Sequence, residues 1–207
     1  KMKALARSYV YWKNIDKDIE ALAKSCDECL QQSKQKKNVK IHPWIFPSGP
    51  WQRLHVDFLG PFENFYYLVI VDAFTKWLEV YQMRSITASA TIENLQDCFS
   101  RFGLPVTIVS DNGSQLTSEE LNDFLKRNGI RLLHSAPYFP MSNGQAERCV
   151  QTVKYALRKY STAPGTFKLK LNNFLLHYRK SPHATTNVSP AELMFGRNIR
   201  TRLDLVI

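Results

Sequence analysis

Three short runs rich in β-branched and aromatic residues follow one another within residues 54–83: LHVDFLG, YYLVIVDAF and WLEVYQM. Turn-prone segments separate them, which predicts three strands in an antiparallel meander. Beyond them, residues 88–102 have helical spacing, LPVTIVSD resembles a buried strand, and SEELNDFLKRNG has the start and stop signals of a helix. IRLLHSAP predicts one more strand, and a long helix is expected from Ser142 to about Tyr160. This order of elements predicts a layered, mixed α/β fold.

The first 50 residues have a different character from the rest of the chain. Residues 4–25 carry apolar side chains at steps of three and four, which predicts two short helices that meet near Asn14. The Lys-rich stretch after them and HPWIFPSGP have the composition of a linker. We therefore predict a small helical module at residues 1–36, a linker at 37–50 and a larger α/β domain at 51–207 with helices at its end.

The charge distribution points to a polyanionic partner. The chain has 28 Lys and Arg against 18 Asp and Glu, a formal net charge of +10. Residues 51–147 are net −4, whereas residues 1–50 are net +5 and residues 148–207 are net +9. An acidic centre between basic flanks suits a site that binds divalent cations beside a phosphate backbone. A soluble protein that is merely basic fits the composition equally well.

The cysteines and the hydropathy pattern indicate the kind of cellular compartment in which we expect the protein. Of the four cysteines only Cys26 and Cys29 are closely spaced, which is not a disulfide framework and favours a reducing compartment. No apolar run approaches the ~18 residues of a membrane-spanning helix. The first residues, KMKALARSYVYW, lack the apolar core of a signal peptide, so we expect neither a membrane location nor secretion.

Three carboxylates form the candidate catalytic site. Asp57 lies inside an apolar strand, Asp111 at the end of a later strand, and Glu147 in the first turns of the long helix. Two-metal phosphoryl transfer needs hard oxygen ligands that hold two divalent ions about 4 Å apart. Taken singly, Asp111 in VSDNGS is also typical of a turn and Glu147 of a solvated helix face. Asp57 is harder to explain in this way, because an unpaired carboxylate in an apolar strand is costly.

Three sequence blocks carry a resemblance to a known family. WQRLHVDFLGPF, IVSDNGSQLTS and APYFPMSNGQAERCVQTVK resemble, in this order, the signature blocks of the integrase core of gypsy-type retrotransposons and retroviruses. The 35 residues between Asp111 and Glu147 match the spacing of that family. YRKSPHATTNVSPAELMFGRNIRTRLDL also resembles the downstream region of metazoan gypsy-type integrases, so the resemblance covers nearly the whole chain.

The resemblance implies a fold, a chemistry and a set of partners. It implies an RNase H-like fold, with a mixed five-stranded sheet flanked by helices, and two Mg²⁺ or Mn²⁺ ions. Asp57 would bridge both ions, and Asp111 and Glu147 would each complete one site. The activity would be trimming of a DNA 3′-end and its transfer into target DNA by a multimer. The residues that we expect to contact DNA, from the resemblance and from the basic helix face, are Asn112, Gln115, Ser142, Asn143, Gln145, Arg148, Lys154 and Arg158.

Two segments depart from the family pattern. Phe139 stands between Tyr138 and Pro140, where many relatives have His or Asn, which puts the DNA contacts of this loop in question. KALARSYVYWKNIDKDIEALAKSCDEC resembles the second half of the family's His-His-Cys-Cys zinc module, but no histidine pair precedes it. Cys26 and Cys29 therefore form half of a tetrahedral zinc site, and Zn²⁺ binding is expected only if upstream histidines are present. Either the chain is a fragment, or the element has decayed.

Alternative functions use the same fold. A domesticated integrase-like protein would bind DNA or protein without catalysis, and metal-dependent nicking separates it from an enzyme. A ribonuclease H would cleave RNA–DNA hybrids, and its carboxylate set usually includes a further acid. Because the fold alone does not decide between these functions, the residues of the site must distinguish them. A DNA-integrating enzyme acts in the nucleus, although the only basic cluster suited to localisation is Lys34–Lys40.

Overall fold

The chain divides into two compact units, Lys1–His42 and Pro43–Ile207. The computed structural model describes Lys3, Ala6 and residues 10–25, 46–111, 113, 115–134, 144–160 and 165–205. Only the backbone is described at residues 23, 24, 144–147, 157, 159, 160 and 203. Within these ranges no helix combines the length and the apolar character that crossing a bilayer requires.

The described part of the smaller unit contains helix α2, Ile15–Ser25. Asn14 precedes it with φ of 71°, a left-handed conformation that Asn tolerates better than most residues. The Asn14 carbonyl accepts hydrogen bonds from the backbone N–H groups of Lys17 and Asp18, at 2.9 and 3.2 Å. The helix boundary thus lies where the sequence predicted two helices to meet, and most of the predicted first helix falls outside the described residues.

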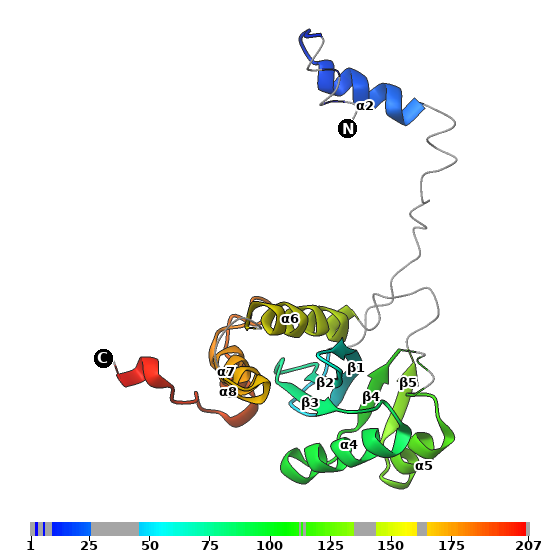
Figure 1. Cartoon of the computed structure of the whole chain (residues 1–207), viewed down its shortest axis with the longest axis vertical. Helices are drawn as coiled ribbons and strands as arrows, with labels where there is room; N and C mark the ends of the chain where they lie inside the picture. Colours follow the sequence, from blue (N-terminus) through cyan, green and yellow to red (C-terminus); the bar gives the residue numbers. More distant parts are fainter. Residues whose placement is uncertain are drawn as a thin grey trace. The chain divides into compact units, whose positions relative to one another are not determined.

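The larger unit is built on a five-stranded sheet with the strand order β3-β2-β1-β4-β5. Helices α4 and α5 lie on one face of this sheet and α6 on the other, as Figure 1 shows. The elements, in chain order, are β1 (Arg53–Phe62), β2 (Phe65–Asp72), β3 (Leu78–Met83), α4 (Ala88–Phe102), β4 (Thr107–Ser110), α5 (Glu119–Arg127), β5 (Arg131–His134), α6 (Gly144–Tyr160), α7 (Phe167–Lys180), α8 (Pro190–Phe195) and the 3₁₀ helix η2 (Arg202–Leu205).

The sheet is mixed. Strands β1, β2 and β3 pair antiparallel, as the predicted meander requires. Strand β4 pairs parallel with β1, from Arg53 opposite Thr107 to Val56 opposite Ser110, and β5 pairs parallel with β4. A parallel pair needs a crossover connection, and α4 and α5 supply the two crossovers on the same face. The central strand β1 therefore contacts an antiparallel neighbour on one side and a parallel neighbour on the other.

Alternating side chains divide the core between the two faces of the sheet. Leu54 and Val56 of β1 point to the face covered by α4 and α5, called here the α4 face. Leu59 points to the opposite face, covered by α6 and α7 and called here the α6 face. The buried core of the α6 face is the smaller one, and consists of Leu59, Tyr67, Val69, Val71, Leu78, Val80, Cys149, Val150, Val153, Leu171 and Leu175.

The helices of the α4 face have capped ends. The Thr87 side chain accepts a hydrogen bond from the Ala90 N–H at the start of α4. Gly103 follows the helix with φ of 83° and donates its N–H to the Phe99 carbonyl at 2.8 Å. Ser118 caps α5 in the same way as Thr87 caps α4. Each cap satisfies backbone groups that a helix end leaves without partners, which fixes where these crossovers start and stop.

A buried ion pair holds α7 against the edge strand β3. The Arg179 Nη2 lies 2.6 Å from Glu79 Oε1, and the same guanidinium donates to the Leu78 carbonyl at 2.8 Å. The Trp77 indole N–H also donates to Glu79, at 2.8 Å, while the Arg179 guanidinium stacks over the Trp77 ring, 4.3 Å from its centroid. These contacts satisfy a carboxylate that is only 6% exposed, and they join α7 to the sheet.

Candidate active site

Asp57 lies in the middle of β1, on the α6 face of the sheet. It pairs with Val69 of β2, a buried residue of the α6-face core. Its side chain is partly exposed, whereas Val56 on the opposite face is fully buried. The Asp57 Oδ1 accepts a hydrogen bond from the Phe58 N–H at 2.7 Å. The cost of a carboxylate in an apolar strand is thus reduced by exposure at the α6 face.

Asp111 follows the last residue of β4, at the edge where that strand ends. The parallel register of β1 and β4 ends with Val56 opposite Ser110, and Asp57 and Asp111 are the residues that directly follow this pair. Neighbouring strands lie about 4.8 Å apart, and residues at equivalent positions face the same side. The sheet therefore brings the two aspartates together on the α6 face, although they are far apart in the sequence.

Hydrogen bonds around Asp111 position the turn that carries it. The Gly113 N–H donates to Asp111 Oδ1 at 3.1 Å. A Cβ atom at Gly113 would lie 3.0 Å from that same oxygen, so glycine allows the backbone to close on the carboxylate. On the other side, His134 Nδ1 of β5 lies 3.2 Å from both the Ser110 Oγ and the Asp111 carbonyl oxygen. The strand end is thus held from two sides. The sequence alone does not indicate this position of His134.

Glu147 lies in the first turn of α6, the helix that covers this face. The helix packs on the sheet through Cys149, Val150 and Val153, all buried in the α6-face core. The backbone of Glu147 is therefore on the element next to the two aspartates. The side chain of Glu147 lies outside the described residues.

The donor set suits a hard divalent cation. Asp57 and Asp111 provide carboxylate oxygens from the neighbouring strands β1 and β4, and such oxygens are the ligands that Mg²⁺ and Mn²⁺ prefer. Among the side chains that the structure describes, no group of three or more His, Cys, Asp or Glu is placed to hold a metal ion. The third predicted ligand, Glu147, is not one of those side chains.

The residues predicted to contact DNA are described only in part. Gln115 is half-buried beside Gly113, and Arg148 is exposed on α6. Gln151 and Arg158 are exposed and Lys154 is half-buried, which agrees with a common solvent-facing side of the helix. Gln145 is described by its backbone alone. The predicted positions that lie outside the described residues are Asn112, Ser142, Asn143, Cys26 and Cys29.

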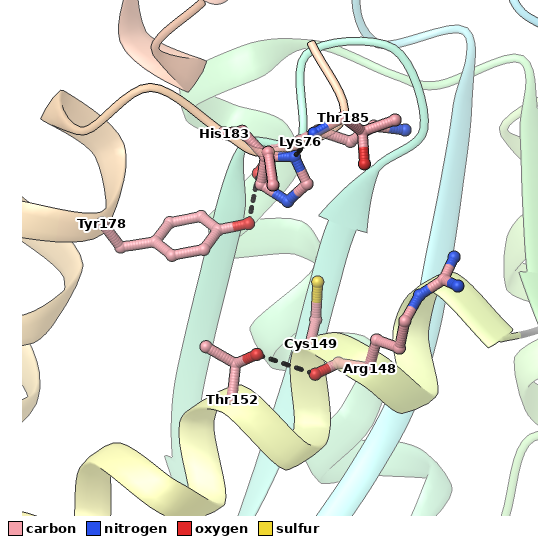
Figure 2. A pocket seen from close by; sticks show the side chains of 8 residues that line it. Lys76, Arg148, Cys149, Thr152, Tyr178, His183 and Thr185 are labelled. Carbon is pink, nitrogen blue, oxygen red and sulfur yellow. Dashed lines mark hydrogen bonds between the residues drawn. The ribbon is translucent and has the colours of Figure 1, made fainter. Parts of the chain in front are cut away.

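A second feature of the α6 face was not found in the sequence. A cavity of about 490 Å³ lies between the start of α6, the turn that joins β2 to β3, and the loop after α7. Figure 2 shows Cys149 and Arg148 on α6, with Lys76 and His183 across the cavity from them. Its lining residues are Lys76, Arg148, Cys149, Thr152, Tyr178, His183, Ala184 and Thr185.

The cavity is electrostatically positive. Burial, followed by the charges of Lys76 and Arg148, lowers the pKa of His183. Burial also raises the pKa of the Cys149 thiol to about 11, so this group carries no negative charge at neutral pH. Lys76 is only 6% exposed, and its ammonium donates to the Ala73 carbonyl at 2.6 Å. No local sequence pattern marks Lys76 as a functional residue.

Comparison with known proteins assigns both parts of the chain. Residues 47–140 match the family model of the integrase core domain. Residues 1–35 match that of the integrase zinc binding domain. The chain contains an integrase core domain. Both matched parts are homologous to the integrase regions of retroviral Pol proteins.

Three relatives align with most or all of this chain. An uncharacterised protein of Caenorhabditis elegans is 45% identical over 207 residues, which is 100% of this chain and 16% of that protein. The Pol polyprotein of radiation murine leukemia virus is 33% identical over 95% of this chain and 35% of its own length. The Pro-Pol polyprotein of feline foamy virus is 29% identical over 90% of this chain and 16% of its own length. The chain thus spans about a third or less of the length of each relative.

Solved integrase structures share the fold. In the simian T-cell lymphotropic virus intasome with PP2A regulatory subunit B56 gamma, the matching chain has a TM-score of 0.70 at 20% identity, over 96% of this chain and 72% of that one. The magnesium complex of the HTLV-2 integrase catalytic core domain, in its trimeric form, has a TM-score of 0.60 at 20% identity, over 71% of this chain and 98% of that one. The integrase fold is RNase H-like, and the predicted fold class is confirmed.

Proposed function

We propose that this chain catalyses metal-dependent polynucleotidyl transfer on DNA. The reaction is trimming of a retroelement DNA 3′-end and transfer of that end into target DNA, with Asp57, Asp111 and Glu147 as the catalytic and metal-binding residues. The observation that carries the proposal is the β1–β4 register, which sets Asp57 beside Asp111 on the face covered by the Glu147 helix. Membership of the integrase core family, whose members are typically polynucleotidyl transferases, supports the same reaction.

The chemistry follows from what these residues can hold. Asp57, Asp111 and Glu147 would bind two Mg²⁺ or Mn²⁺ ions, which supply positive charge at the attacking and leaving oxygens of the phosphate. The two aspartates are fixed by the sheet and by the Gly113 N–H, so little reorganisation is needed when DNA binds. A 3′-hydroxyl oxygen then forms a bond to a target phosphorus as the bond to the leaving 3′-oxygen breaks. The hydroxyl proton passes to solvent, and the leaving 3′-oxygen takes up a proton from solvent.

The finer features of the function are proposals of the same kind. The source is a gypsy-type retroelement, as the signature blocks suggested, and the partners are its DNA ends and a target DNA. The enzyme acts as a homomultimer in the nucleus. Related structures described as an intasome and as dimeric and trimeric cores support assembly of such proteins. Zinc binding through Cys26 and Cys29 remains conditional on histidines that precede them.

The test is metal-dependent resolution of a branched DNA that mimics the joined product. This reverse reaction requires less of modules outside the core than end processing does. We expect the parent chain to resolve the branch with Mn²⁺ and not with EDTA. Asp111→Asn keeps the size of the side chain and removes its charge, and should lower the rate at least about 10³-fold. Asp123→Asn makes the same chemical change on the exposed side of α5 and should leave the rate unchanged.

The alternatives give different results in the same experiment. If the folded parent binds DNA but does not turn it over, the enzyme proposal is wrong and a domesticated, non-catalytic DNA-binding role is favoured. If an RNA–DNA hybrid is cleaved faster than the branched DNA, the substrate class is wrong and a ribonuclease H activity replaces it. An unchanged rate in Asp111→Asn would show that the measured activity belongs to a contaminant or to a different site. Equal loss in Asp111→Asn and Asp123→Asn would show that the loss is not specific to the carboxylate site.

A further inference from the structure

The positive cavity on the α6 face is not part of the carboxylate site. It is lined by residues from three segments that are distant in the sequence: the β2–β3 turn, the start of α6, and the region from the end of α7 into the loop after it. Two of the eight lining side chains are basic, Lys76 and Arg148, and none is a carboxylate. Burial lowers the pKa of Lys76, and the charge of Asp72 acts in the opposite direction. At about 490 Å³, the space is large enough for a phosphate group with its two ester oxygens and some water.

One buried carboxylate, Asp72, acts on the charge of Lys76. Asp72 is fully buried at the end of β2 and accepts hydrogen bonds from the Trp51 N–H at 3.2 Å and from the Thr75 N–H and hydroxyl at 2.8 and 2.7 Å. It attracts Lys76 but does not line the cavity. Because Lys76 is held by the Ala73 carbonyl and by the Phe46 ring, 5.4 Å from its centroid, its charge is fixed in place rather than mobile in solvent.

The loop after α7 adds a neutral hydrogen-bond donor. The Thr185 N–H donates to His183 Nδ1 at 3.2 Å, so a neutral His183 carries its proton on Nε2. The Thr186 and Asn187 N–H groups both donate to the His183 carbonyl, at 3.1 and 2.8 Å, which fixes the loop around the ring. A neutral imidazole N–H beside two cations is suited to an anion, because it donates without adding a charge to be repelled.

The cavity lies on the same face of the sheet as the carboxylates. The β2–β3 turn is beside the first residue of β1, since the Ala73 N–H donates to the Arg53 carbonyl at 2.9 Å. Asp57 is four residues further along β1, which corresponds to roughly 13 Å. Charges of one DNA strand are spaced about 3.4 Å apart along the helix axis, so the two sites are separated by a few nucleotides. Arg148 directly follows Glu147 and connects the two sites along α6.

We propose that the cavity formed by Lys76, Arg148 and His183 binds a phosphate group of the DNA backbone, a few nucleotides from the phosphate that reacts. The identification of the ligand as DNA rests on the proposed function. The site would position the strand without reading its sequence, because a phosphate contact carries no base information. It would act by charge and by the Nε2 donor, and Thr185 at its exposed rim is the place where an introduced negative charge would exclude the phosphate.

The test is DNA binding in EDTA, where no turnover occurs, as a function of salt concentration. Thr185→Glu introduces a carboxylate at the rim, and Asn173→Glu makes the same change of charge on the exposed side of α7. We expect Thr185→Glu to weaken binding at least about tenfold and Asn173→Glu less than about twofold. The slope of log K against log salt should become shallower by about 0.9 in Thr185→Glu alone, the value for one lost phosphate contact. Thr185→Val, which adds no charge, should bind almost as the parent does.

Inorganic phosphate separates a DNA site from a site for a free anion. Phosphate should shift the NMR signals of the Thr185 amide and the His183 ring in the parent and not in Thr185→Glu. Equal weakening by Thr185→Glu and Asn173→Glu, with unchanged slopes, overturns the DNA contact. If phosphate still shifts the signals in that case, the cavity binds a free anion instead. If the parent binds no DNA at all, the proposed function fails, and the phosphate titration alone decides whether the cavity is an anion site.

Discussion

The two faces of the sheet differ in what their buried residues do. The α4 face has the larger hydrophobic core, and its two crossover helices have capped ends. The α6 face has a smaller hydrophobic core and also holds the candidate functional groups: Asp57 and Asp111 at one place, and the Lys76 cavity at another. The comparison indicates that one face provides the stability of the domain while the other carries its chemistry. Changes on the two faces should therefore affect different measurements.

The largest expected effect is on the α6 face and on activity alone. Asp57→Asn keeps the shape of the side chain and the acceptor for the Phe58 N–H, but removes a charge from the proposed metal site. We expect the rate of branched-DNA resolution to fall at least about 10³-fold. The free energy of unfolding, from urea titration, should change by less than about 1 kcal/mol, because the carboxylate is partly exposed. A larger loss of stability would show that Asp57 is mainly structural.

The second prediction concerns the ion pair that links α7 to the edge of the sheet. Glu79→Gln removes the charge that faces Arg179 and leaves a largely buried guanidinium without its carboxylate. Breaking a buried pair from one side costs about 3–5 kcal/mol of unfolding free energy. Chemical denaturation would measure this loss, and the activity per folded molecule should stay near that of the parent. If activity falls much more than the folded fraction, the edge strand also supports the active site, and the division between faces is wrong.

The third prediction compares one apolar residue from each core. Leu95→Ala on α4 should cost about 3 kcal/mol of unfolding free energy, because it leaves a cavity in the larger core, with little change in the activity of folded molecules. Val153→Ala on α6 removes fewer atoms and should cost about 2 kcal/mol. It should nevertheless lower the rate about tenfold, because α6 carries Glu147 and small displacements of a catalytic group are costly. Equal effects of the two variants on activity would contradict the comparison.

The smallest expected effect is at a helix cap of the α4 face. Thr87→Ala removes the side-chain acceptor for the Ala90 N–H and should lower the unfolding free energy by about 1 kcal/mol. Thr87→Ser retains the hydroxyl and should recover most of the loss. The rate of branched-DNA resolution should be unchanged in both variants. A change in rate in these variants would show that a shift of α4 alters the active site on the α6 face.

Much of the architecture was predictable because it depends on local patterns. The runs LHVDFLG, YYLVIVDAF and WLEVYQM form β1, β2 and β3, and the helix predicted at residues 88–102 is α4. Short strands with alternating burial and helices with capping residues are encoded by neighbours within a few positions. Asp57 could also be singled out from its immediate neighbours, because they place a carboxylate inside an apolar strand. Its role in catalysis stays a prediction.

The sequence by itself therefore determined the order and type of the elements, the family of the domain and the three acidic candidates. Only the tertiary structure decided which residues meet: Asp57 beside Asp111 through the β1–β4 register, Glu79 against Arg179, and Lys76 with Arg148 and His183 around one cavity. The physical reason is that strand register and helix packing join segments that are far apart in the chain. The residues next to Lys76 or His183 in the sequence therefore do not indicate which distant residues these two contact in the fold.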